Sequence, residues 1–149
     1  YSGNGRGLGE IVVAQVNKHN AEKHFVNRPL IFTNDTNEEK DVKNRLIMKD
    51  CDTMIVVGGQ DESLTSSKNV INQYFTFVNN SEGKKYPLVI PIPSTGYAAQ
   101  EIFNSEEFRH SNVFQTNQKL FTELGNTTEI EYIVHLLVNL IMSYKTEKV

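Results

Sequence analysis

The sequence predicts an α/β protein with a Rossmann-like, three-layer arrangement, in which helices cover both faces of a parallel sheet. Short apolar runs typical of strands alternate along the chain with longer segments typical of helices, which indicates successive βα units. Glycine turns follow the expected strand ends, and four of the nine glycines fall within residues 3–9. The chain has 149 residues, 38% of them hydrophobic and 22% charged, as expected for one globular domain spanning residues 1–149.

The first expected elements follow the glycine-rich loop. The apolar residues 11–16 predict a helix, and residues 28–33 predict a short buried strand. Thr36 and Glu39 have the spacing of a capping box, so a second helix is expected from there to about residue 49. Almost no strand precedes the glycine loop. We therefore expect the chain to be a fragment of a longer protein that lacks the first βα unit of its fold.

Residues 53–57 form the clearest expected strand. This continuous run of β-branched and apolar residues predicts a central parallel strand covered on both faces. Gly58 and Gly59 should end the strand, and a helix is expected over residues 68–80.

A fourth strand is expected over residues 86–91, where two prolines predict a shorter or more peripheral position in the sheet. Residues 94–96 predict a turn into a helix that begins at Tyr97. The pattern of residues 104–126 is ambiguous. Thr128 and Glu131 again have capping-box spacing, which predicts a long helix ending near residue 144.

This last helix is apolar nearly all round and is therefore expected to be buried on more than one side. Two arrangements fit that pattern. Leu136 and Leu140 could lie in the core of the domain, or at the centre of an interface between subunits of a homo-oligomer.

Composition excludes several classes of function. The net charge of -3 argues against nonspecific nucleic-acid binding, which needs a basic surface. No apolar run reaches the roughly 18 residues that a membrane span needs. The single cysteine, Cys51, cannot form an internal disulfide, and it predicts a reducing, cytoplasmic compartment. The four histidines show no metal-ligand spacing, so no metal site is expected.

The glycine-rich loop is a candidate anion site. Glycine allows the backbone to approach an anion closely, and a helix that starts just after the loop adds unpaired N–H groups and partial positive charge. The alternative is a loop that is merely flexible. The spacing G-x-G-x-G-x-G differs from the dinucleotide fingerprint, so an ordinary Rossmann cofactor is not expected. The candidate ligand-binding residues are Gly3, Asn4, Gly5, Arg6, Gly7, Leu8 and Gly9.

Two further glycine turns are expected on the same edge of the sheet, because ligands of open parallel sheets bind outside the carboxyl ends of the strands. An arginine before the main strand could grip phosphate with paired hydrogen bonds, and a glutamate after the last turn could bind ribose hydroxyls or could merely suit the first turn of its helix. These candidates are Arg45, Gly58, Gly59, Lys68, Thr95, Gly96 and Glu101.

Four motifs together resemble the SLOG superfamily, which is related to the LOG phosphoribohydrolases. They are R-P-x-x-F at 28–32, N-R-x-x-M at 44–48, V-V-G-G at 56–59 and P-x-P-S-T-G-Y-A-A-x-E-I at 91–102. The resemblance covers the chain up to about Phe103, and it is strongest to the C-terminal sensor domains of Thoeris antiphage effectors.

The resemblance implies a sensor. Such domains bind a cyclic ADP-ribose-type small molecule and thereby activate a sirtuin-like, NAD-hydrolysing domain of the same polypeptide within an oligomer. LOG enzymes carry a catalytic glutamate in G-G-x-G-T-x-x-E, and that position falls near Gln73 here, where an amide cannot act as a general base. The arginine with which LOG enzymes contact phosphate maps onto Arg45. We therefore expect no enzymatic activity from this chain and no cofactor.

Two alternatives remain open. The chain could be a divergent LOG-like nucleotide phosphoribohydrolase, or it could be an assembly domain whose pocket no longer binds a ligand. Release of adenine from adenosine monophosphate would distinguish the enzyme from the sensor.

Overall fold

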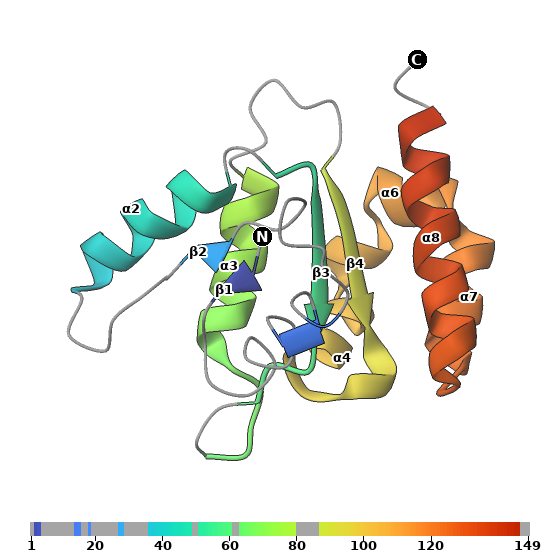
Figure 1. Ribbon diagram of the computed structural model, residues 1–149, viewed down its shortest axis with the longest axis horizontal. Coiled ribbons are helices and arrows are strands. Elements are labelled where there is room, and N and C mark those ends of the chain that lie inside the picture. The colour runs from blue at the N-terminus through green and yellow to red at the C-terminus, as the bar shows by residue number, and fades with distance from the viewer. Residues whose placement is uncertain are drawn as a thin grey trace. The chain divides into compact units, whose positions relative to one another are not determined.

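The computed structural model describes residues 2–3, 14–15, 18, 27–28, 36–48, 51–60, 63–79 and 87–146. The protein is a mixed α/β chain, mostly helical, with a small parallel sheet (Figure 1). It divides into two compact units, Tyr1–Cys51 and Asp52–Val149. In the described part of the chain, no helix is both long and apolar enough to span a membrane.

The first unit contains two very short parallel strands, β1 (Ser2–Gly3) and β2 (Asn27–Arg28), and the helix α2 (Asn37–Met48). The N–H of Glu39 donates to Thr36 Oγ1 at 3.2 Å, and the N–H of Thr36 donates to Glu39 Oε2 at 2.8 Å. These reciprocal bonds confirm the predicted capping box and fix the start of α2.

Two other predictions for this unit are described only in part. Ala14 and Gln15 are helical, as expected, whereas residues 11–13 and 16 lie outside the described residues. Of the strand expected over 28–33, only its first residue is described, and it belongs to β2.

The second unit is built on a βαβ unit. β3 (Thr53–Val57) and β4 (Leu88–Ile92) pair in parallel, from Thr53 opposite Leu88 to Val57 opposite Ile92, and α3 (Lys68–Asn79) lies between them in sequence. Both strands and the helix agree with the sequence prediction. A parallel pair needs such a long crossover connection, which α3 supplies.

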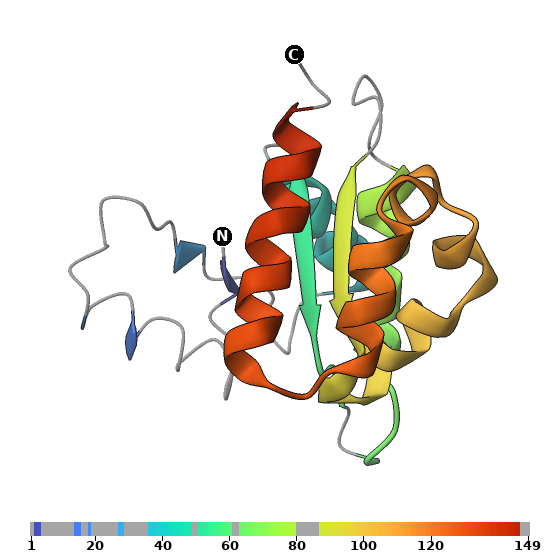
Figure 2. The same ribbon diagram turned by 90° about the vertical axis from the view of Figure 1, so that its right-hand side faces the viewer.

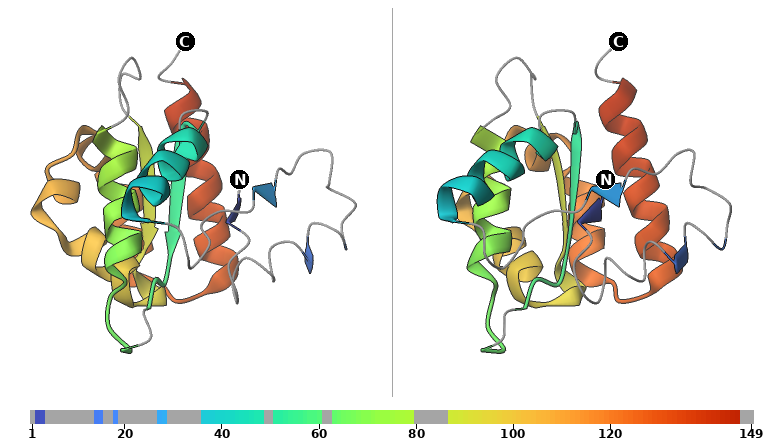
Figure 3. Two further views of the ribbon diagram at one scale, coloured as in Figure 1. Left: turned by 90° about the vertical axis from the view of Figure 1, so that its left-hand side faces the viewer. Right: turned by 60° about the vertical axis from the view of Figure 1, so that its left-hand side comes forward.

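Helices lie on both faces of this sheet. Within the second unit, α3 covers one face, and α7 (Gln118–Asn126) and α8 (Ile130–Thr146) cover the other (Figures 1 and 2). The views in Figure 3 show the α3 side. α4 (Tyr97–Asn104) packs on both strands and on α3.

Burial of the two strands differs from the expectation. All five residues of β4 are buried, whereas the side chain of Ile55 in β3 is 46% exposed. In the described part of the chain β4 pairs only with β3, and an edge strand tolerates Pro91, which has no N–H to donate. The shorter or more peripheral strand expected from the prolines is therefore not borne out, because β4 has five residues, as β3 has, and both strands are edges of this two-stranded sheet within the described residues.

The segment of ambiguous pattern, residues 104–126, forms α5 (Glu106–Arg109), α6 (Asn112–Thr116) and α7. Ser105 and Ser111 cap the first two of these helices, because their hydroxyls accept the N–H of Phe108 and Phe114 at 3.2 Å. The buried aromatic rings of these helices and of α4 pack with centroids 5.3–6.3 Å apart. They belong to Phe103, Phe108, Phe114 and Phe121.

α8 settles the choice between core and interface. Leu136 and Leu140 are 1% and 0% exposed, so they belong to the core of this chain, and the interface alternative is wrong for these two residues. Exposed apolar side chains occupy another face of α8, namely Ile130, Val134, Val138 and Met142. Before its start, the N–H of Glu129 donates to Thr127 Oγ1 at 3.2 Å, and neither bond of the predicted capping box of Thr128 and Glu131 forms within the described residues.

Candidate functional site

The turns that follow β3 and β4 are joined by hydrogen bonds. The N–H of Gly58 donates to Thr95 Oγ1 at 2.7 Å, and that hydroxyl donates to the carbonyl of Ile92 at 2.6 Å. The N–H of Ala99 in α4 donates to the carbonyl of Gly58 at 2.8 Å. Two of the three predicted glycine turns therefore form one connected edge at the carboxyl ends of the strands.

Glycine has a distinct role at each turn. Gly59 has φ of 88°, and a Cβ placed there would lie 2.7 Å from Cβ of Ala98, so glycine is what lets α4 approach the end of β3. Gly96 follows a short 3₁₀ helix (Pro93–Thr95) with φ 76° and ψ -169°, a conformation that only glycine adopts readily. A Cβ on Gly96 would meet nothing within 4 Å, so this turn faces open space.

That open space is a broad basin of about 660 Å³ at the start of α4. Its α4 side consists of residues that share one helical face, because residues three and four apart lie above one another on a helix. The loop before α3 forms the other side. The lining residues are Thr65, Ser66, Gly96, Tyr97, Gln100, Glu101 and Asn104.

The first residue of α4, Tyr97, lines this basin, whereas Ala98 is fully buried and does not line it. Gly96 is the N-cap and supplies no side-chain bond, and within the described residues the N–H groups of Tyr97 and Ala98 make no hydrogen bond. Such N–H groups and the helix dipole favour an anion. Tyr97 itself has φ of 50°, which is strained for a residue with a side chain.

The charge in the basin is acidic. Of the described residues that line it, Glu101 alone is charged, and its side chain is exposed. A guanidinium stands next to the basin, where Arg109 Nη2 donates to Asn104 Oδ1 at 3.2 Å and the guanidinium carbon lies 5.2 Å from the ring centroid of Phe103. The basin therefore pairs a helix N–H donor, suited to an anion, with a carboxylate, suited to hydroxyl groups.

The predicted site residues of the second unit divide into three groups. Gly96 and Glu101 line the basin, and the bonded pair of Gly58 and Thr95, with Gly59, forms the edge beside it. Lys68 is exposed at the first residue of α3, and Gln73 is half-buried farther along that helix. Neither of these two lines the basin.

Of the predicted site residues in the first unit, the structure describes Gly3 and Arg45. Gly3 lies in β1, and Arg45 is exposed in the last turn of α2. The remaining loop residues fall outside the described part of the chain, and they are Asn4, Gly5, Arg6, Gly7, Leu8 and Gly9.

Several lining residues escaped the sequence analysis, namely Thr65, Ser66, Tyr97, Gln100 and Asn104. Helical spacing could have found those on α4, since Tyr97, Gln100 and Asn104 share a face with the predicted Glu101. The sequence gives no comparable signal for the loop residues Thr65 and Ser66, because the path of this loop depends on a β-bridge between Gln60 and Ser66.

The described residues contain no cluster of three or more histidine, cysteine or acidic side chains that could hold a metal ion. Cys51, the single cysteine of the sequence, is half-buried. Comparison of the chain with protein-family models finds no match, and comparison with curated proteins finds none either.

Proposed function

We propose that this chain is a ligand-sensing domain that binds a nucleotide of the cyclic ADP-ribose type in the basin at the start of α4. One observation carries the proposal: Tyr97, whose N–H makes no hydrogen bond within the described residues, lines a space that Gly96 leaves free. A phosphate at this helix start would receive charge-assisted hydrogen bonds.

The carboxylate of Glu101 complements that anion site. On α4, Glu101 lies one helical turn beyond Tyr97 and lines the same basin. A carboxylate accepts hydrogen bonds from vicinal ribose hydroxyls. A ligand with a phosphate and a ribose side by side would satisfy both ends of the basin.

The resemblance of the motifs to the SLOG superfamily supplies the finer proposal. We propose that the βαβ unit of β3, α3 and β4 is part of a Rossmann-like parallel sheet. Ligand binding would then activate a sirtuin-like, NAD-hydrolysing domain of the same polypeptide, in a cytoplasmic homo-oligomer that acts in antiphage defence.

A second candidate function has one observation in its favour. A divergent nucleotide phosphoribohydrolase needs a general acid or base at the glycosidic bond, and Glu101 is a carboxylate that lines the basin. The residue at the position of the LOG glutamate, Gln73, is an amide and does not line the basin. We therefore favour sensing over hydrolysis.

A thermal-shift screen with cyclic and linear ADP-ribose species, combined with an adenine-release assay on adenosine monophosphate, tests the proposal. We expect a rise in melting temperature with a cyclic species and no release of adenine. Release of adenine that disappears in Glu101→Gln would establish the hydrolase. Absence of any shift with every nucleotide would contradict ligand sensing and favour an assembly domain.

A further inference from the structure

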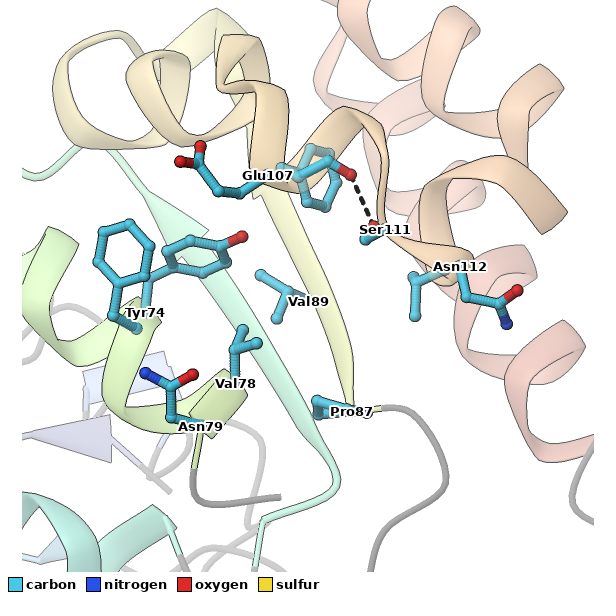
Figure 4. A pocket seen from close by; sticks show the side chains of 11 residues that line it. Tyr74, Val78, Asn79, Pro87, Val89, Glu107, Ser111 and Asn112 are labelled. Carbon is cyan, nitrogen blue, oxygen red and sulfur yellow. Dashed lines mark hydrogen bonds between the residues drawn. The ribbon is translucent and has the colours of Figure 1, made fainter. Parts of the chain in front are cut away.

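A second cavity lies in the same unit, toward the end of the sheet where β4 begins. It has a volume of about 280 Å³, is partly open, and is lined by residues of α3, β4, α5 and α6 (Figure 4). Its walls are mainly apolar and include Tyr74, Phe75, Val78, Val89, Glu107 and Phe108. None of these residues lines the basin at the start of α4. The volume suits a fragment-sized ligand.

Tyr74 places a polar atom at this cavity. Its side chain is 4% exposed, and the hydroxyl projects from α3 into the space in front of Val89 (Figure 4). Within the described residues that hydroxyl makes no hydrogen bond, and it is in contact with the open space of the cavity. A ligand atom in the cavity could supply the missing partner.

Glu107 adds a negative charge on the same side of the cavity. Its carboxylate lies on α5 across from the Tyr74 hydroxyl (Figure 4), and no ion pair joins it to a cation in the described part of the chain. Burial, and after it the charge of Glu107, raise the pKa of Tyr74. The hydroxyl therefore stays protonated at neutral pH and can both donate and accept a hydrogen bond.

The carboxylate of Glu107 and the hydroxyl of Tyr74 together favour a positively charged ligand. Glu107 repels an anion, and a purely apolar molecule leaves the Tyr74 hydroxyl unpaired. A cation finds the carboxylate, the hydroxyl oxygen and the aromatic rings of Phe75 and Phe108, which also attract positive charge.

We propose that this cavity binds a small organic cation, a primary amine with an aromatic or branched apolar body. The ammonium group donates hydrogen bonds to the carboxylate of Glu107 and to Tyr74 Oη. The apolar body packs against Val78, Val89 and Phe108. The inference does not depend on the nucleotide proposed for the basin at α4.

Calorimetric titration of the whole chain with three probes of similar shape tests the proposal. The probes are phenethylamine, 2-phenylethanol and 3-phenylpropionate, which differ mainly in the charge of the polar end. We expect the amine to bind, the alcohol to bind more weakly and the carboxylate not to bind. Equal affinity for all three probes, or no saturable binding of the amine, would overturn the proposal.

Two variants and a matched control locate the charge effect. We expect Glu107→Gln to weaken amine binding by about three- to tenfold, as for a partly exposed ion pair with an added cation–π contact, and to leave alcohol binding unchanged. Tyr74→Phe should weaken both. The control is Glu106→Gln on the same helix, because both glutamates are exposed but only Glu107 lines the cavity. An equal loss in Glu106→Gln and Glu107→Gln, with both variants folded by circular dichroism, would contradict a direct contact.

Discussion

The backbone N–H of Gly58 donates a hydrogen bond to the hydroxyl of Thr95 across 2.7 Å, and this bond joins the turns after β3 and β4. Thr95→Val keeps the shape of the side chain but removes both the acceptor for Gly58 and the donor to Ile92. We expect the free energy of unfolding to fall by about 1–3 kcal/mol, the usual cost of leaving partly buried groups unpaired. Urea denaturation measures it. Thr95→Ser, which keeps the hydroxyl, should lose less, and equal losses would show that the hydroxyl does not matter.

Gly59→Ala and Gly96→Ala form a matched pair, because both residues have positive φ but only one is crowded. Both substitutions incur backbone strain, and Gly59→Ala also brings a Cβ to 2.7 Å from that of Ala98. We therefore expect Gly59→Ala to destabilise the fold more than Gly96→Ala, by about 1–3 kcal/mol for overpacking. Nucleotide binding should suffer more in Gly96→Ala. Equal melting temperatures for the two variants would contradict the crowding at Gly59.

Leu136 and Val138 test the two faces of α8. Leu136 is buried, so Leu136→Glu places an unpaired charge in the core and should cost about 3 kcal/mol or more. Val138 is exposed, so Val138→Glu should change the free energy of unfolding by only about 0.5 kcal/mol. Chemical denaturation compares them. Sizing chromatography of Val138→Glu also tests the proposed homo-oligomer, because a contact through this face would be lost in a folded variant.

The raised pKa of Tyr74 predicts a loss of stability at high pH. Since the folded protein holds the hydroxyl proton more tightly than the unfolded chain does, stability is retained below the ordinary tyrosine pKa of 10.0 and falls as the pH rises above it. Melting temperatures at pH 8 and pH 11 should therefore differ less in Tyr74→Phe than in the unchanged protein. Tyr132, whose pKa is raised mainly by a hydrogen bond to Glu123, remains in both proteins as an internal reference. An unaltered pH dependence in Tyr74→Phe would assign the effect elsewhere.

Local chemistry in the sequence predicted much of the fold. The capping pair of Thr36 and Glu39 predicted the start of α2, and the turn at Gly96 predicted the start of α4. The three helices before α8 were not predicted; α5 and α6, with four and five residues, are too brief to show a helical period. Their repeated Ser-x-x-Phe pattern, at residues 105–108 and 111–114, carries both the caps and the core rings.

Tertiary arrangement was harder to predict than local structure. Burial of Leu136 and exposure of Val138 depend on which face of α8 meets β4, which an evenly apolar helix does not specify. In the candidate site, the sequence predicted the two glycine turns directly, from Gly58 and Gly59 and from Gly96. Gln100 and Asn104 become candidates only once the helical register of α4 is fixed from Gly96.

Titration of ¹⁵N-labelled protein with a cyclic ADP-ribose species tests the central claim most directly. The account predicts that the amide resonance of Tyr97 moves the most on binding, because a phosphate at the start of α4 would hydrogen-bond to this unpaired N–H group. Resonances of the Tyr74 cavity should stay in place. A saturable titration that leaves Tyr97 unmoved, or no binding at all, would contradict a nucleotide site in this basin.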